Sequence, residues 1–129
     1  MRVYNKWHSM IKKELKKMNL THPQFVVLAS LAYLSQDSNE VTQVMISKLS
    51  GIDVMTVSQI LNLLEKNDFV KRKEHSKDTR AKAVILNKKG EETLQKAVPL
   101  IEQIDEIFFK KLDTDEEQFK HFLVRLNEE

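Results

Sequence analysis

A glycine between two helical patterns limits the fold of this chain more than any other feature. Gly51 is one of only two glycines among 129 residues. Glycine adopts the left-handed backbone of a helix end at the lowest cost, and Asp53 is a good cap for a helix that starts after the turn. Apolar residues recur at helical spacing on both sides, at Val44, Met45, Ile46 and Leu49 and at Val57, Ile60, Leu61 and Leu64. The pattern predicts two short helices joined by a sharp turn, a helix-turn-helix.

The second of these helices has a polar face. That face carries Met55, Thr56, Ser58, Gln59 and Asn62. Short hydroxyl and amide side chains suit a helix that lies in the major groove of DNA, where they meet base edges. The helix has no Lys or Arg between Asp53 and Glu65. An ordinary helical hairpin with a solvated polar face is the alternative interpretation of the helices alone.

A basic hairpin is predicted directly after these helices. Strand-like runs begin at Phe69 and at Ala83, and the polar residues 75–80 connect them. A hairpin tip that carries cations can reach phosphates or a narrow minor groove, and Asp78 can orient the guanidinium of Arg80. The predicted DNA contacts outside the helical face are Thr42, Lys73, Lys77, Asp78, Arg80 and Lys82. Without the preceding helices, the same hairpin would be interpreted as a solvated charged loop.

Residues 41–90 resemble the MarR family of winged-helix transcriptional regulators. The block Leu49–Val70 is similar to the family's third and fourth helices, and the D-x-R motif of the wing is present as Asp78-Thr79-Arg80. The closing pattern of the family is matched by Val84–Gly90. The resemblance implies a mainly α fold with a small β-wing, in which helices from both termini form a dimerisation layer. It also implies a short strand at residues 40–42 that joins the wing sheet.

The chain departs from the family pattern in three ways, the first of which is the lack of Lys and Arg between Asp53 and Glu65. Asp68 stands where the family usually has Gly, and we expect Asn67 or Asp68 to adopt the left-handed conformation that this turn needs. Asn87 stands in place of the usual Thr, and we expect its side chain to cap the following helix.

Helical segments flank the predicted winged helix. Residues 2–18 have an apolar stripe that needs a partner, either within the subunit or in a second subunit. Thr21 with Gln24 predicts a capping box at the start of a second, buried helix. Residues 88–112 predict a long helix that Pro99 should kink, with two helices broken at Pro99 as the alternative.

The last helix is predicted after an acidic cap at residues 113–117, with Phe119, Phe122, Leu123 and Leu126 on its apolar side. We therefore divide the chain into dimerisation and scaffold helices at 1–35, a DNA-binding region at 36–90, and dimerisation helices at 91–129. All three are expected to form one intertwined domain.

The formal charge is distributed unevenly along the chain. Residues 43–90 hold 10 Lys and Arg against 5 Asp and Glu, a net charge of +5, whereas residues 91–129 hold 5 against 11, a net charge of −6. The positive block coincides with the predicted DNA-binding region, as attraction to phosphate requires.

Several classes of protein are disfavoured. There is no cysteine, and the four histidines show no metal-ligand spacing, so we expect no metal and no cofactor. Nucleophile elbow, P-loop and dinucleotide motifs are absent from the sequence, so we expect no enzyme. No apolar run is long enough for a bilayer, and the N-terminus lacks a signal-peptide core, so we expect a cytoplasmic protein without a membrane partner.

The leading functional hypothesis is a homodimeric, sequence-specific DNA-binding regulator with a near-palindromic operator. The resemblance implies a repressor that a small aromatic or anionic effector relieves by binding between the dimerisation helices and the DNA-binding region. Candidate residues for the wall of that effector site are Trp7, His8, Met10, Phe25 and Tyr33. The alternative is a winged-helix module that binds proteins and no longer binds DNA.

Overall fold

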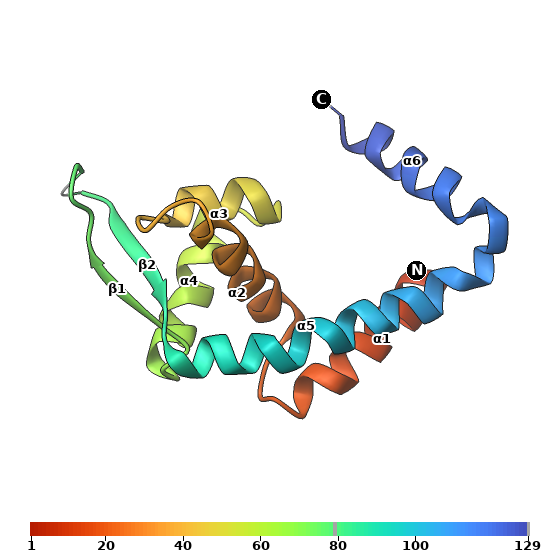
Figure 1. Ribbon diagram of the computed structural model, residues 1–129, viewed down its shortest axis with the longest axis horizontal. Helices are drawn as coiled ribbons and strands as arrows, with labels where there is room; N and C mark the ends of the chain where they lie inside the picture. The colour runs from red at the N-terminus through yellow and green to blue at the C-terminus, as the bar shows by residue number, and fades with distance from the viewer. Residues whose placement is uncertain (79, 129) are drawn as a thin grey trace.

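The computed structural model describes residues 1–78 and 80–128. The chain forms α1 (Arg2–Lys16), α2 (His22–Ser35), α3 (Gln43–Ser50), α4 (Val54–Lys66), β1 (Val70–Glu74), β2 (Lys82–Leu86), α5 (Lys88–Phe109), the 3-10 turn η1 (Lys110–Asp115) and α6 (Glu116–Asn127). The β-hairpin and α6 lie at opposite ends of the molecule, and α1 runs beside α5 (Figure 1). The predicted mainly α fold with a small β-wing is confirmed.

Helix α2 lies at the centre of the core and packs against α1, α3, α4, α5 and β2. Its Val27, Leu28 and Leu31 are fully buried. The predicted core positions of α4 are confirmed, because Val57, Ile60, Leu61 and Leu64 are all buried. Burial of each such side chain contributes about 1.5–3 kcal/mol, so this cluster fixes α4 on the body of the protein.

Local capping defines where the helices start. Thr21 and Gln24 form the predicted capping box of α2, and the Thr42 hydroxyl accepts from the Met45 N–H at the start of α3. Gly51 ends α3 with a φ of 77°, the left-handed conformation expected of it. Of the apolar stripe expected on α3, Ile46 is buried and Met45 packs against the core, whereas Val44 is 50% exposed and Leu49 is 47% exposed.

The wing is a two-stranded antiparallel sheet in which Val70 pairs with Leu86 and Glu74 with Lys82. Val41 forms an isolated bridge to Val84 on the other edge of β2, where the Val84 N–H donates to the Val41 carbonyl at 2.7 Å. The short strand predicted at residues 40–42 is thus reduced to one bridged residue.

The chain enters and leaves the wing through close contacts. Asp68 has a φ of 63°, so it takes the left-handed conformation at the position where the family has Gly. A Cβ on Gly90 would overlap the carbonyl oxygen of Phe69. The close approach of α5 to the start of the wing therefore requires glycine at position 90. Asn87 occupies the N-cap position of α5, but its side chain makes no cap and instead donates to the Asp68 carbonyl at 3.2 Å. The predicted capping role of Asn87 is wrong for that reason.

Helix α5 is continuous through Pro99 and ends at Phe109, so the alternative of two helices broken at the proline is wrong. The chain then turns at Asp113, which has a φ of 49°. Asp115 is the N-cap of α6 but makes no side-chain hydrogen bond, whereas Glu116 and Glu117 supply the predicted acidic first turn.

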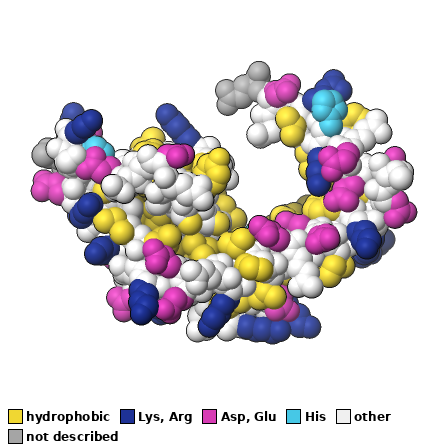
Figure 2. Space-filling view, viewed as in Figure 1, with side chains coloured by type: hydrophobic (Ala, Val, Ile, Leu, Met, Phe, Trp, Pro, Cys, Tyr) yellow, Lys and Arg dark blue, Asp and Glu magenta, His cyan; other side chains and the backbone are white. Residues whose placement is uncertain are grey.

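Helix α6 stands away from the rest of the chain and packs mainly on η1. None of its described residues is buried. Hydrophobic side chains reach the surface along the hollow between α6 and the body of the molecule (Figure 2).

No single helix among residues 1–78 and 80–128 is long and apolar enough to cross a membrane. Helices α3 and α4 pass that test only when joined, and they are bent by 114° at Gly51–Asp53. Both contribute to the core of the winged helix, through Ile46 and the buried face of α4.

Candidate nucleic-acid interface

Helix α4 is held at its N-terminus by Asp53. One carboxylate oxygen of Asp53 accepts from the Thr56 N–H at 2.9 Å, and the other accepts from the Thr56 hydroxyl at 2.7 Å. These hydrogen bonds from Thr56 hold the pKa of Asp53 below its ordinary value. Because the Thr56 hydroxyl proton is used on Asp53, its oxygen is left to accept from an outside donor.

The solvent-facing side of α4 carries the residues predicted from its polar face. Met55 is 74% exposed, Gln59 and Asn62 are exposed, and Thr56 and Ser58 are half-buried. Their spacing places them along one side of the helix, opposite the buried residues. This side is free of basic side chains until Lys66, the last residue of the helix.

Arg72 on β1 joins the wing to α4. Its Nη2 donates to the Asn62 side-chain oxygen at 2.7 Å and, at 3.4 Å, to the Ser58 carbonyl. The Arg72 Nε is shielded from solvent and has no hydrogen-bond partner among the described residues. The guanidinium is therefore fixed against the exposed side of α4.

The tip of the wing is fixed by Glu40 and His75. The Glu40 carboxylate accepts from the Ser76 N–H at 2.9 Å and lies 3.4 Å from the His75 Nε2. The His75 Nδ1 accepts from the backbone N–H groups of Lys77 and Asp78 at 3.1 and 3.2 Å. Hydrogen bonds from Ser76 hold the pKa of Glu40 below its ordinary value. The segment before α3 therefore supports the hairpin tip.

Asp78 and Arg80 interact mainly through the backbone. The Arg80 N–H donates to the Asp78 carboxylate at 3.0 Å, whereas the Arg80 Nε lies 3.9 Å from that oxygen. The side chain of Arg80 is 96% exposed and free to reach outward. Thr79, the middle residue of the D-x-R motif, lies outside the described residues.

The other predicted contacts are spread around the wing. Lys77 and Lys82 are exposed near its outer end. Lys73 alternates with Arg72 along β1, so it points to the opposite face, where it borders a pocket with Ser38 and Glu91. Thr42 is half-buried and uses its hydroxyl as the cap of α3. The structure thus brings the α4 residues and Arg72 together, leaves Lys77, Arg80 and Lys82 exposed on the outer part of the wing, and turns Lys73 to the opposite face of β1.

The five candidate effector residues do not share one site. Trp7 donates its indole N–H to Asp105 at 2.7 Å, and Met10 packs against the core. Phe25 is buried, and Tyr33 is 61% exposed. His8 borders a cavity of about 450 Å³ beside the start of α2, which is lined by His8, Lys12, Lys16, Leu20, Thr21, His22 and Pro23.

Partial burial lowers the pKa of His22 in this cavity, and the nearby His8 lowers it further, while Asp105 acts in the opposite direction. The cavity combines apolar walls with two lysines at its rim, which suits a small anion with an apolar body.

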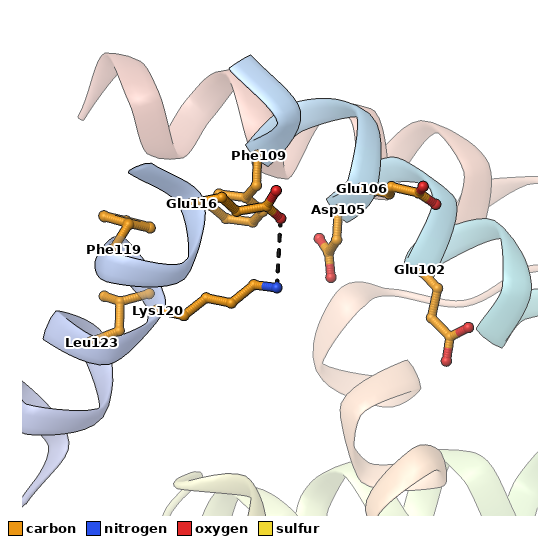
Figure 3. A pocket seen from close by; sticks show the side chains of 8 residues that line it. All are labelled: Glu102, Asp105, Glu106, Phe109, Glu116, Phe119, Lys120 and Leu123. Atoms are coloured by element: carbon orange, nitrogen blue, oxygen red, sulfur yellow. Dashed lines mark ion pairs between the residues drawn. The ribbon is translucent and has the colours of Figure 1, made fainter. Parts of the chain in front are cut away.

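A second cavity of about 390 Å³ lies between α5 and α6 (Figure 3). Four acidic side chains line it, with two phenylalanines and a leucine: Glu102, Asp105, Glu106, Glu116, Phe109, Phe119 and Leu123. Lys120 points into it and pairs with Glu116 at 3.5 Å. In the part of the chain that the structure describes, no group of three or more His, Cys, Asp or Glu is arranged to hold a metal ion.

Reasoning from sequence missed Arg72, Glu40 and His75 as parts of this interface. Arg72 carried a weak signal, because an Arg in a strand two residues after the buried Val70 must point to the same side as that core residue. Glu40 and His75 carried no local signal, since 35 residues separate them.

Comparison with known proteins agrees with this geometry. A family model described as the ArnR1-like winged-helix domain matches residues 16–104. The HTH-type transcriptional regulator YdcH of Bacillus subtilis is 35% identical over 103 residues, which cover 80% of this chain and 70% of YdcH.

Two solved structures share the fold over 96% of this chain and 86% of their own. BpsR of Bordetella bronchiseptica, whose DNA binding is regulated by 6-hydroxynicotinic acid, is 27% identical with a TM-score of 0.81. A MarR mutant from E. coli complexed with operator DNA is 22% identical with a TM-score of 0.82, which shows likeness of fold.

Proposed function

This chain belongs to the MarR family of winged-helix transcriptional regulators, and from that premise we propose that it is a homodimeric, sequence-specific DNA-binding repressor that a small effector releases from a near-palindromic operator. The observation that carries the proposal is the joint surface of α4 and the wing. An exposed polar helix face lies beside a hairpin whose tip presents Arg80, and Arg72 fixes the two together.

The division of contacts follows from the chemistry of each part. On α4, the amides of Gln59 and Asn62 and the oxygen of Thr56 contact base edges, and Met55 touches a thymine methyl group. On the wing, Lys77, Arg80 and Lys82 contact phosphates or the minor groove, and Asp78 holds the backbone at Arg80. Thr42 and Lys73 contribute less, because one is used as a helix cap and the other points away from α4.

Dimerisation is supported by apolar surface at both termini. Val3 on α1 is 70% exposed, and on α6 the exposed fractions are 45% for Phe122, 47% for Leu123 and 82% for Leu126. Large apolar side chains exposed at both termini are typical of an interface. A two-fold dimer presents two α4 helices about one DNA turn apart, which makes the operator a near-palindrome.

Relief by an effector is supported by the cavity at His8, Lys12 and His22 and by the regulation of BpsR by an aromatic acid. We call residues 36–90 of each subunit a head. An effector releases DNA if it binds more tightly to a dimer whose two heads are wrongly spaced for the operator than to one whose heads fit it. Since the cavity lies outside the heads, an effector there acts on their spacing.

A protein-interaction module is the second candidate. It is favoured by the exposed apolar residues of the helix pair, since Val54 is 41% and Leu63 is 51% exposed. On a DNA-binding surface, the apolar side chains of Val54 and Leu63 would gain little binding free energy from contact with phosphates.

Selection of duplexes from a random DNA pool tests the proposal. We expect the protein to recover an inverted repeat with half-sites about 10 base pairs apart, and its affinity to fall steeply as salt rises. Recovery of no duplex even at low salt would favour the protein-interaction module.

A further inference from the structure

Arg72 determines which atoms Asn62 presents to DNA. The guanidinium has only donors, so the atom of Asn62 that lies 2.7 Å from Nη2 is the amide oxygen. The amide NH₂ group therefore points away from Arg72 and is free to donate. Arg72 itself is half-buried, with its Nε shielded from solvent, so the guanidinium stays against α4.

This arrangement weakens the usual pairing of asparagine with adenine. That pairing needs the amide to donate to N7 and to accept from the N6 amino group at the same time. A positive charge in contact with the amide oxygen draws electron density from its remaining lone pair and repels an approaching N–H group. A DNA atom that only accepts meets no such repulsion.

We infer that Arg72 is a positioning residue that makes Asn62 a hydrogen-bond donor to an acceptor atom of DNA and disfavours adenine at that position. The acceptor is guanine O6 or N7, thymine O4 or a phosphate oxygen. The inference rests on the proposed function and deepens it, since it assigns a preference to one side chain of the same surface.

The surroundings of Asn62 make this effect local. No Lys or Arg occurs between Asp53 and Glu65, so no other basic side chain of this stretch of α4 competes for the amide. Lys71 and Lys73 flank Arg72 on the same strand, and Lys73 points to the opposite face of the wing, where it borders a pocket. Lys73 therefore offers a matched control for loss of one positive charge from β1.

The experiment repeats the random-pool selection with the wild-type chain, Arg72→Met, Asn62→Ala and Lys73→Met, and compares base frequencies at each operator position. In the wild type, we expect guanine or thymine at the position that Asn62→Ala makes degenerate. In Arg72→Met, we expect adenine to gain at that same position by roughly fivefold to a hundredfold. Lys73→Met should weaken binding to every sequence alike.

A second arm detects a phosphate contact. If Asn62 donates to a phosphate, Asn62→Ala should change no base frequency. A methylphosphonate in place of that phosphate should then weaken binding of the wild type but not of Asn62→Ala. Arg72→Met should then reduce the same loss.

A further variant guards against misfolding of Arg72→Met. Asn62→Asp keeps an acceptor for Arg72 but has no NH₂ group, so we expect it to lose affinity for the wild-type operator. Circular dichroism checks that each variant is folded.

Three results would overturn the inference. They are adenine at the Asn62-dependent position of the wild-type operator, wild-type affinity of Asn62→Asp, or base frequencies and methylphosphonate effects in Arg72→Met that equal those of the wild type. If the wild type itself recovers no duplex, the proposed function fails and this inference with it. If it recovers an operator that these variants bind unchanged, only the inference fails.

Discussion

Trp7 and Asp105 are joined by a 2.7 Å hydrogen bond from the indole N–H to the carboxylate, across 98 positions of sequence. The bond connects α1 to the C-terminal half of α5. Trp7 also contacts the His22 ring, with the two ring centroids 5.5 Å apart, so the start of α2 is attached at the same point. Three helices are thus held together at the end of the molecule from which η1 and α6 extend.

Replacing Trp7 by Phe tests this attachment. We expect Trp7→Phe to lower the free energy of unfolding by about 1–2 kcal/mol, because a part-buried carboxylate loses its donor. Urea unfolding at one fixed protein concentration measures the change. Asp105→Asn keeps an acceptor and should cost less; equal stability of Trp7→Phe and the wild type would contradict the expectation.

Lowering the pH should destabilise the protein in part through His22. Its folded-state pKa is lowered, chiefly by partial burial, so below about pH 6.5 the unfolded chain takes up a proton more readily than the folded one. The contribution of His22 to stability is therefore present above that pH and is lost as the pH falls toward the folded-state pKa.

His22→Gln should flatten the loss of thermal stability between pH 7 and about pH 5. His121→Gln, at an exposed histidine of α6, is the control and should follow the wild type. Parallel curves for His22→Gln and the wild type would show that burial of His22 has no part in the pH dependence.

A charge on the apolar side of α6 should separate the proposed dimer. We expect the wild type to sediment as a dimer at micromolar concentration and Leu123→Glu to sediment as a monomer, because the carboxylate would be buried without a partner. Val44→Glu places the same charge on an equally exposed apolar residue of α3 and should stay dimeric. A wild-type monomer, or a dimeric Leu123→Glu, would count against the interface.

Arg80→Ala should weaken binding to all duplexes and reduce the slope of log affinity against log salt by about 1. Gln59→Ala should change the preference at one base pair and leave the slope as it is. Fluorescence anisotropy across a salt series distinguishes these outcomes, with Lys111→Ala in η1 as a control for loss of a distant charge. If Arg80→Ala keeps the wild-type affinity and slope, the wing does not contact phosphate.

Gly90→Ala should destabilise the junction of the wing and α5 by about 1–3 kcal/mol, since the added methyl group meets the Phe69 carbonyl. Helix propensity alone favours Ala there by about 1 kcal/mol, but backbone atoms of Phe69 cannot move aside easily. Gly51→Ala meets nothing within 4 Å, so its cost is limited to the strain of an alanine at a φ of +77°. Thermal melts should therefore rank Gly90→Ala below Gly51→Ala.

The local parts of the fold could be predicted because their signals span three or four residues. The caps at Thr21, Thr42 and Asp53 each pair a side chain with an N–H three positions later. The turn at Gly51 and the left-handed Asp68 depend on backbone preferences of single residues. These features placed the helix pair and the start of the wing correctly.

The errors arise where distant segments decide the outcome. Asn87 donates to Asp68, 19 positions earlier, in place of capping its own helix. Val44 and Leu49 match a helical stripe, but α3 has only one short buried side. The contact between Arg72 and Asn62 requires the wing to fold back on α4, which no residue pattern encodes locally.

The Val84 N–H joins β2 to the Val41 carbonyl just before α3, and Arg72 joins β1 to α4. The hairpin is thereby tied to the helix pair along both of its edges, so we expect the two to move as one piece. We then expect no hinge inside this piece on which the proposed effector could act. In the proposed dimer, we expect DNA to be released when the separation of the two pieces no longer matches the roughly 34 Å repeat of the duplex. When one piece then binds its half-site, the other cannot reach the second half-site.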